Sequence, residues 1–246
     1  MGNKDKRVNT GRRAWLTQEK IMYAAMKLTR ECGLEKWSIR DLAQRLGVVP
    51  SVIYHHYQNR DAITASVISE ITSTIELPDE QLEWKDWFIS LAGNVRPVFL
   101  EFPGVTDKLI YGHMDATLLP ILEMAYEKLR DAGFSQYIHI AYTIIINTML
   151  WSITARNLRS PTKQEQRHDL DQMITRLQPL AACSTTLADI LQGYLIPLAN
   201  PKNEDHMSQE YFEIIIEVVL AGLEIAILPR EKTPNEPMSK RSHQYT

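Results

Sequence analysis

Residues 33–60 read GLEKWSIRDLAQRLGVVPSVIYHHYQNR, and this stretch decides the fold of the first part of the chain. Ser38 and Asp41 have the spacing of a capping box, which starts a helix by satisfying its first backbone amides. Gly47 is placed to end that helix, since glycine adopts the left-handed conformation that closes helices. Pro50 follows closely and is tolerated in the first turn of the next helix. The sequence therefore predicts two helices joined by a tight turn.

A longer helix is expected upstream of these two. Thr17 is a suitable N-cap, and apolar residues recur at three- and four-residue steps from Ile21 to Cys32, before Gly33. The helix after the turn is expected to be short, over residues 51–57. Three short helices with a tight turn between the second and third have the geometry of a helix-turn-helix, whose last helix enters the major groove of DNA.

The spacing of these helices, the Gly47 turn and the tail from Ile53 to Arg60 resemble the N-terminal domain of the tetracycline-repressor family. The resemblance covers about residues 17–71. It implies an all-α fold, in which an N-terminal three-helix helix-turn-helix domain precedes a larger helical ligand-binding and dimerisation domain. It also implies which residues touch bases or phosphates of DNA: Arg40, Pro50, Ser51, Val52, Tyr54, His55, His56 and Arg60.

Two valines in this region depart from the family pattern. Val49 stands where the family often has a capping serine, and its side chain cannot accept a hydrogen bond from the backbone. Val52 stands where Thr, Ser or Ala is common, and we expect it to face outward with His55 and His56 and to meet a thymine methyl group. Without the resemblance, the two histidines would read as solvated surface residues.

The charge of the chain is unevenly distributed. Residues 1–60 hold twelve Lys and Arg against five Asp and Glu, a net charge of +7, and the rest of the chain carries −10. This balance suits a protein whose head approaches a polyanion, although basic N-terminal arms often have no such role. Arg12 and Arg13 are expected either to follow the DNA backbone or minor groove, or to belong to a disordered tail.

Other classes of protein find little support. No phosphate-binding glycine loop, GxSxG or HExxH motif is present, and Cys32 and Cys183 have no metal-type spacing, so we predict no enzyme, cofactor or metal. The chain opens with polar and basic residues, and its apolar stretches are interrupted by Asn147, Glu217 and Glu224. We therefore expect a soluble cytoplasmic protein with no membrane partner.

The remaining residues read as helices. We divide the chain into a flexible basic arm (1–14), the helix-turn-helix domain (15–62), a helical ligand-binding and dimerisation domain (63–230) and a disordered tail (231–246). Within the third part, residues 195–207 are expected to form a loop because of Pro197 and Pro201. The helices are expected over residues 82–102, 106–113, 118–132, 135–159, 162–180, 185–195 and 211–228.

The predicted helix over residues 211–228 carries the strongest sign of an oligomer, since 14 of its 18 residues are apolar. Such a helix is buried nearly all round, in a core or against another subunit. The resemblance implies that this helix and the one over 135–159 pair across a two-fold axis, and burial within a monomer is the alternative. A symmetric homodimer would read a palindromic double-stranded DNA operator.

The resemblance also implies a ligand cavity among the helices of residues 82–159. Each candidate for lining it can equally be a core residue. His113 and Asp115 are too few for a metal site. The candidates are Trp84, Trp87, Phe88, Asn94, Arg96, Tyr111, His113, Met114, Asn147 and Trp151.

We therefore expect a ligand-responsive transcriptional regulator that acts as a repressor. A small hydrophobic or amphipathic effector is expected to release it from DNA. Two alternatives remain at this point. One is a ligand-independent or architectural DNA-binding protein, and the other is an all-helical enzyme whose N-terminal resemblance is accidental. The sequence identifies neither the effector, nor the operator, nor the regulated genes.

Overall fold

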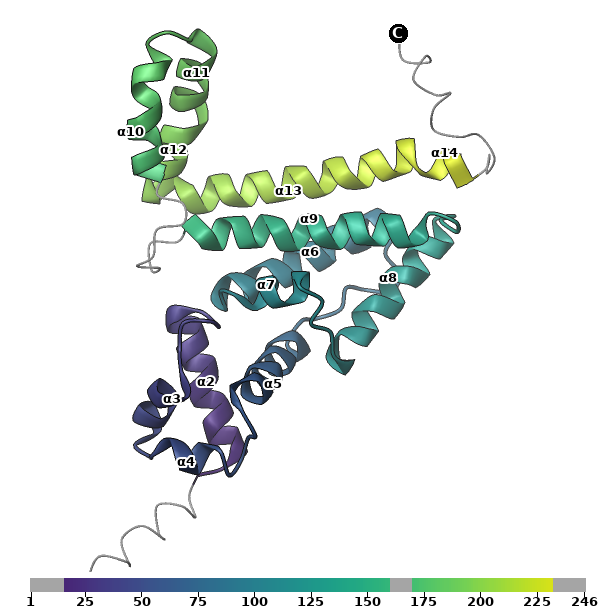
Figure 1. Ribbon diagram of the computed structural model, residues 1–246. Helices are drawn as coiled ribbons and strands as arrows, with labels where there is room; N and C mark the ends of the chain where they lie inside the picture. The colour runs from purple at the N-terminus through teal and green to yellow at the C-terminus, as the bar shows by residue number, and fades with distance from the viewer. Residues whose placement is uncertain (1–15, 160–169, 232–246) are drawn as a thin grey trace, which may run out of the picture. The chain divides into compact units, whose positions relative to one another are not determined.

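The computed structural model describes residues 16–159 and 170–231 (Figure 1). Arg12, Arg13, the predicted arm and nearly all of the predicted tail lie outside these residues. The described part of the chain consists of helices and contains no strand, which confirms the all-α prediction. Its elements are α2 (Gln18–Cys32), α3 (Ile39–Leu46), α4 (Pro50–Ile53), α5 (Arg60–Ser73), α6 (Trp84–Glu101), α7 (Val105–Ile110), the 3-10 turn η1 (Ala116–Leu118), α8 (Leu119–Asp131), α9 (Ile138–Arg159), α10 (Leu170–Ala181), α11 (Thr185–Ile190), the π-helical η2 (Leu191–Leu195), α12 (Ile196–Ala199), α13 (Pro201–Ala226) and α14 (Leu228–Glu231).

Contacts divide the chain into two compact units. Among the described residues, unit 1 joins residues 16–75 with 95–118, 153–159 and 170. Unit 2 comprises residues 76–94, 119–152 and 171–231. The three helices of the helix-turn-helix therefore share their unit with α5, α7 and one end each of α6 and α9.

The first two helices of the helix-turn-helix begin and end where the sequence predicts. The Thr17 hydroxyl accepts from an amide at the start of α2, the Ser38 capping box is complete at α3, and the Asn59 side chain accepts from the Ala62 amide at α5. Gly47 has a φ of 65° and is left-handed, as expected of a C-terminal glycine. The core of this segment is made of fully buried side chains from all of its helices: Ile21, Leu34, Leu42, Ile53 and Ile63.

The loop between α2 and α3 is joined to the turn between α6 and α7, both in unit 1. The Leu34 amide donates to the carbonyl oxygen of Pro103 at 2.8 Å. A Cβ atom on Gly104, whose φ is 92°, would lie 3.3 Å from the Leu34 Cβ, and one on Gly33 would lie 3.3 Å from the Pro103 oxygen. Two glycines therefore allow the two backbones to approach closely.

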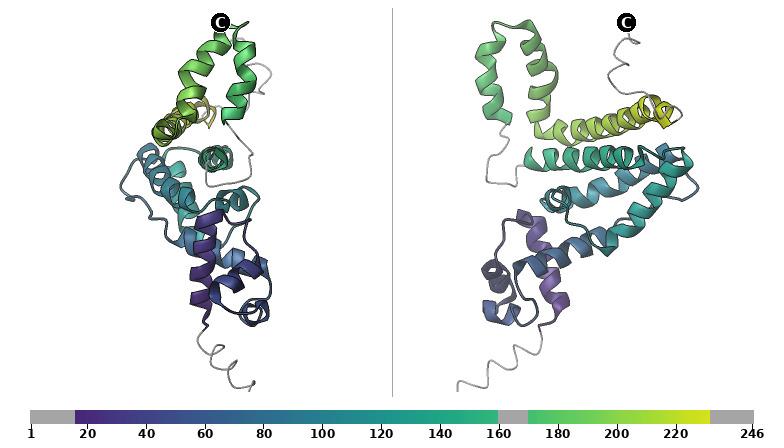
Figure 2. Two further views of the ribbon diagram at one scale, coloured as in Figure 1. Left: turned by 90° about the vertical axis from the view of Figure 1, so that its left-hand side faces the viewer. Right: turned by 45° about the vertical axis from the view of Figure 1, so that its right-hand side comes forward.

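Unit 2 is held together by an aromatic core and by contacts that its last helices make. The Trp84 ring meets the edge of Phe134 at a centroid distance of 5.6 Å. The Lys85 ammonium lies 2.8 Å from the Glu224 carboxylate of α13. The Glu231 carboxylate in α14 accepts from three backbone amides, those of residues 135–137, just before α9 begins. Both views of Figure 2 show α13 and α9 side by side.

The predicted loop over residues 195–207 is wrong. Only Asn200 interrupts the helices there, because α12 ends at Ala199 and α13 begins at Pro201. Asn200 caps α13 by accepting from the Lys202 amide at 3.0 Å, and Pro201 occupies the first turn, where a missing amide costs nothing. At this position proline starts a helix and does not break one.

Helix α9 is long and apolar enough to cross a membrane by composition alone, with a mean hydropathy of 1.4 over its best window. In that window 39% of the residues are buried inside the protein. Three of its large apolar side chains, Ile140, Ile144 and Trp151, are exposed.

Candidate nucleic-acid interface

The turn that carries the recognition helix is fixed by backbone hydrogen bonds. After Gly47, the Val48 amide donates to the carbonyl of Ala43 at 3.0 Å. Val49 is the N-cap of α4 and makes no side-chain capping bond, as the sequence predicted. The helix itself is shorter than expected, since the regular part ends at Ile53 and a tight turn covers residues 54–56.

Most of the predicted DNA-contacting side chains face solvent on and beside this helix. Ser51 and His55 are exposed, and so is Tyr54, whose exposed fraction is 51%. Arg40 is exposed near the start of α3. Pro50 and His56 are half-buried. Hydroxyl, imidazole and guanidinium groups are donors and acceptors suited to base edges and phosphates, so this face has the chemistry that DNA binding needs.

Val52 does not face outward as predicted. It is 6% exposed and packs in the core together with Ile53. The prediction assumed a regular helix through Tyr57, on which the two positions point in different directions. In the structure α4 has only four residues, and Val52 and Ile53 are both core residues.

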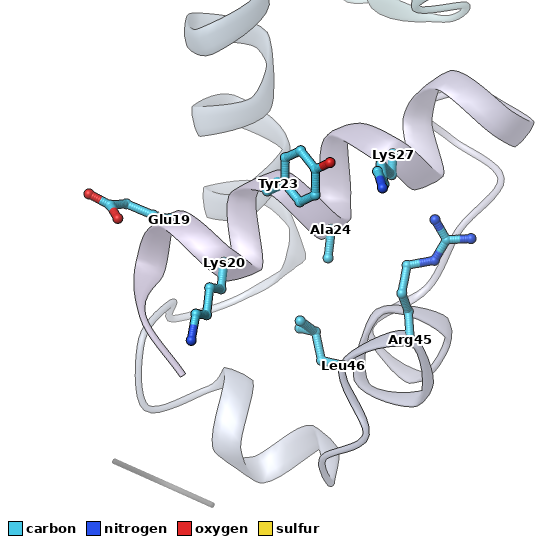
Figure 3. Close-up of a pocket in the computed structure, with 7 residues that line it drawn as sticks. All are labelled: Glu19, Lys20, Tyr23, Ala24, Lys27, Arg45 and Leu46. Carbon is cyan, nitrogen blue, oxygen red and sulfur yellow. The ribbon is translucent and has the colours of Figure 1, made fainter. Parts of the chain in front are cut away.

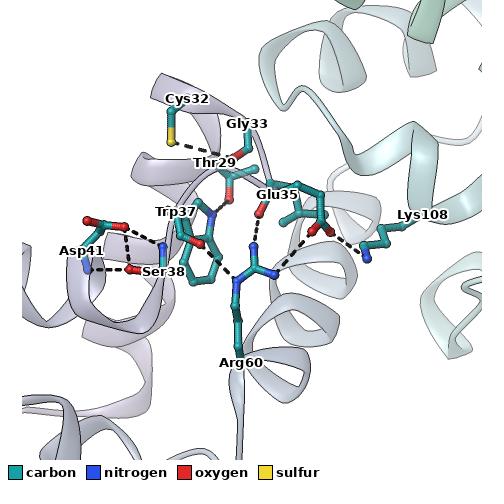
Figure 4. A network of polar contacts seen from close by, with 10 residues as sticks. Thr29, Cys32, Gly33, Glu35, Trp37, Ser38, Asp41, Arg60 and Lys108 are labelled. Atoms are coloured by element: carbon teal, nitrogen blue, oxygen red, sulfur yellow. Dashed lines mark hydrogen bonds and ion pairs between the residues drawn. The ribbon is translucent and has the colours of Figure 1, made fainter. Parts of the chain in front are cut away.

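Arg60 was expected to hold a phosphate, and the structure places it in a network within the protein (Figure 4). Its guanidinium donates to the carbonyl oxygens of Leu34 at 2.8 Å and Trp37 at 3.1 Å. It also stacks over the Trp37 ring, 5.0 Å from the centroid. These bonds tie the start of α5 to the loop between α2 and α3. Contact between Arg60 and a phosphate stays a prediction.

Glu35 extends this network to α7. Its carboxylate lies 3.5 Å from Arg60 Nη1 and 2.7 Å from the Lys108 ammonium (Figure 4). The hydrogen bond from Lys108, aided by the charge of Arg60, lowers the pKa of Glu35 against the opposing effect of partial burial. Sequence reasoning missed both Glu35 and Lys108, because no local pattern pairs residues 73 positions apart.

A groove of about 550 Å³ lies on the helix-turn-helix between α2 and α3 (Figure 3). Its lining includes Lys20, Lys27 and Arg45 beside the exposed ring of Tyr23. The Lys27 ammonium stands over that ring at 4.7 Å from the centroid, and Arg45 is paired with Glu31. The cations that line the groove belong to the excess of positive charge found in residues 1–60.

The predicted ligand-contacting residues have varied surroundings within each unit. In unit 2, Trp84, Trp87 and Phe88 are buried, whereas Asn147 and Trp151 are exposed on α9. Asn94, also in unit 2, donates to the Glu76 carbonyl at 2.8 Å. In unit 1, Arg96 and His113 are half-buried, while Tyr111 and Met114 are exposed.

Asp115 has partners other than a metal. Its carboxylate accepts from the Ser69 hydroxyl of α5 and from the Thr117 amide and hydroxyl. Partial burial opposes ionisation of Asp115, but these bonds outweigh it and lower the pKa. Within residues 16–159 and 170–231, no three metal-ligating side chains come together.

Known proteins with a helix-turn-helix are similar in sequence to this part of the chain. Residues 21–67 match the family described as "Bacterial regulatory proteins, tetR family". An HTH-type transcriptional regulator of Saccharopolyspora erythraea is 27% identical over 146 residues, which are 58% of this chain and 62% of that relative. The match therefore spans less than two thirds of the relative's length.

Solved structures share the fold. The TetR family protein ActR of Streptomyces coelicolor, in complex with actinorhodin, superposes with a TM-score of 0.65 at 22% identity, covering 85% of this chain and 96% of ActR. BioQ with its natural double-stranded DNA operator superposes with a TM-score of 0.52 at 22% identity, covering 68% and 99%. Together with the sequence match over the helix-turn-helix, these findings show that residues 21–67 are similar to the helix-turn-helix segment of the tetR family and that the chain shares the fold of these solved structures.

Proposed function

We propose that this chain is a ligand-responsive transcriptional repressor of the cytoplasm, which binds a palindromic operator as a homodimer. The observation that carries the proposal is the recognition helix α4, held by a fixed turn with Ser51, Tyr54 and His55 exposed beside it. Exposed donors at the start of a recognition helix are what reading of the major groove requires.

A row of exposed apolar side chains supports the homodimer. The members on each helix are three, four or seven residues apart, so they share one face of α9 and one face of α13. We call this surface the α9–α13 stripe. It comprises Ile140, Ile144 and Trp151 on α9, and Tyr211, Ile214, Val218 and Ile225 on α13.

The stripe is too apolar to face water in a stable soluble protein. Buried residues of α13, such as Phe212, Ile216 and Leu220, occupy its opposite face, so each side of the helix has its own apolar surface. A second copy of the chain offers the same stripe, and a two-fold axis would join the two as a four-helix bundle. Such a dimer would present two recognition helices about 34–36 Å apart to successive major grooves.

An effector site in unit 2 accounts for an unusual buried group. The Trp87 side chain is fully buried, yet its indole Nε1 has no hydrogen-bond partner in the described part of the protein. Leaving a buried donor unpaired costs about 1–3 kcal/mol, which an acceptor on a ligand would recover. Trp84 and Phe88 are near Trp87 in sequence and are also buried. The unpaired N–H group and the aromatic side chains near it favour an aromatic effector that carries a carbonyl or similar acceptor.

DNA binding is tested by selecting sites from a random duplex library and measuring affinity for the selected palindrome. We expect a double variant, Tyr54→Ala with His56→Ala, to lose most of this affinity, because both residues lie at the recognition helix. Tyr23→Ala is the matched control, since Tyr23 is a similarly exposed tyrosine on α2. Undiminished binding by the double variant would contradict the assigned surface.

Effector binding is tested by a thermal-shift screen of aromatic compounds, followed by a DNA-release assay on each hit. A releasing ligand must bind the DNA-incompetent state more tightly, by about 1–3 kcal/mol. Hits should lose affinity in Trp87→Phe, which keeps an aromatic ring and removes the N–H group. Equal affinity of all hits for this variant would contradict the role of Trp87.

A further inference from the structure

The two valines of the recognition helix lie in opposite environments. Val52 is 6% exposed and belongs to the core, whereas Val49 is 57% exposed at the N-cap of the same helix. Val49 is therefore a better candidate than Val52 for the predicted apolar contact with a thymine methyl group. Single exposed valines are ordinary on protein surfaces, so the exposure of Val49 matters only because of its position.

The position of Val49 is determined by its neighbours. The left-handed Gly47 and the bond from the Val48 amide to Ala43 fix the turn that precedes it. Pro50 follows it and restricts the backbone of Val49 to the extended conformation, which it has at φ −87° and ψ 151°. The Val49 carbonyl also accepts from the Val52 amide at 3.0 Å and so begins α4. The side chain is thus held in place at the leading end of the recognition helix.

Val49 is also poorly explained by the needs of the fold. An N-cap residue usually has a side-chain oxygen that accepts from the first amides of its helix, and Val49 makes no such bond. More than half of its surface is exposed. A residue that neither caps the helix nor fills the core is free to serve the face that meets DNA.

The chemistry of a valine side chain selects its target. In a helix-turn-helix, the residues at the N-terminal end of the recognition helix contact base edges. The thymine C5-methyl is the apolar group that base edges present in the major groove, and the other groups there are donors and acceptors. The exposed Ser51 and Tyr54 beside Val49 can serve those polar groups.

We infer that Val49 is a specificity-determining residue that packs against the methyl group of one thymine in each half of the operator. The inference rests on the proposed function, since it takes DNA binding by α4 as given. It replaces the predicted contact by Val52 and makes thymine the required base at one position of each half-site.

The experiment uses the full-length protein and the palindrome selected from a random library. Each thymine is replaced in turn by deoxyuridine, which removes only the methyl group. We expect deoxyuridine at one thymine position to lower the affinity of the protein for the operator by about fourfold for each half-site in which it is placed. This loss corresponds to withdrawing one methyl-sized group from an apolar contact. The other thymines should show little change.

Variants at Val49 then connect the lost methyl to this side chain. In Val49→Ser, which adds a hydroxyl and removes the methyl groups, affinities for the thymine and deoxyuridine sites should become equal at that position. Tyr54→Phe is the control, because it should weaken binding to both sites and keep the fourfold difference. Thermal unfolding of each variant confirms that the domain remains folded.

The outcomes distinguish failure of the Val49 contact from failure of the proposed function. Loss of the deoxyuridine effect in Val49→Ser but not in Tyr54→Phe supports the inference. A full deoxyuridine effect in Val49→Ser, or no effect at any thymine with the unmodified protein, would overturn it while leaving DNA binding intact. Failure of the library to yield any enriched site would overturn the proposed function itself.

Discussion

The helix-turn-helix and the α9–α13 stripe differ in how their apolar residues are used. The first buries its isoleucines and leucines within unit 1 and leaves mainly polar side chains beside α4 exposed. The second leaves large apolar side chains exposed along two long helices of unit 2. The exposed surface beside α4 is suited to a polar partner, whereas the α9–α13 stripe is suited to an apolar one.

This difference separates two kinds of information in the sequence. Short-range signals such as caps and glycines specify where most helices of the helix-turn-helix begin and end. The stripe has no motif of its own, and only the packing of α13 reveals which of its many apolar residues remain uncovered. The predictions that follow test each surface for the property that distinguishes it.

The largest effect is expected on the stripe. Val218 is 62% exposed in the single chain, and in a dimer Val218→Asp would bury a charge without a partner. We expect the variant to sediment as a monomer and to lose about hundredfold or more in operator affinity. Asn203→Asp adds the same charge at an exposed position near the start of α13 and should remain dimeric. A dimeric Val218→Asp protein would show that the stripe has another occupant.

A smaller effect is expected from Arg60, which belongs to the polar framework of the helix-turn-helix. Arg60→Met removes two hydrogen bonds to carbonyl oxygens and should lower the free energy of unfolding by about 2–3 kcal/mol. Urea unfolding measures this loss. If Arg60 instead held a phosphate, stability would change little and the salt dependence of DNA binding would weaken by about 0.9 in its log–log slope.

The pair of Glu35 and Lys108 should contribute less, because both side chains are partly exposed. A double-mutant cycle with Glu35→Gln and Lys108→Met should give a coupling energy of about 0.5 kcal/mol at neutral pH. The pKa of Glu35 is lowered in the folded state, so the coupling is complete above the ordinary value of 4.5 and is lost as pH falls through the lower folded value. Urea unfolding of the four proteins across this range checks the sign, which a coupling that grows in acid would contradict.

The smallest expected change is a gain. Val49→Ser supplies the side-chain cap that α4 lacks and should raise the free energy of unfolding by about 0.5–1 kcal/mol. Thermal unfolding without DNA measures it, with Val49→Ala as the control for loss of the valine. An equal stability of the serine and alanine variants would indicate that water already satisfies the helix amides.

The sequence predicted those parts of the fold that depend on neighbouring residues. Thr17, Ser38, Gly47 and Asn59 act at the helix ends where their side chains or backbone preferences place them. Most helix bounds in the rest of the chain agree to within a few residues. The exception at Pro201 arose because the same residue can end one helix or begin the next.

Features that depend on distant contacts could not be predicted in this way. The burial of Val52 follows from how four residues of α4 sit on other helices, and periodicity over so short a helix is a weak guide. Arg60 meets Leu34 and Trp37 only after the chain has folded back. The sequence therefore predicted which helix ends form the helix-turn-helix, but not which of its candidate residues are exposed and which are held within the protein.

The close approach of Gly33 and Gly104 bears on how this protein could be recombined with its relatives. A chimera that exchanged only residues 1–62 would combine one loop between α2 and α3 with another protein's turn between α6 and α7. Any side chain larger than hydrogen at either glycine would then press on the facing backbone, and both positions have a positive φ. A working exchange of DNA specificity should therefore carry the segment around Pro103 along with the helix-turn-helix, or else keep both glycines.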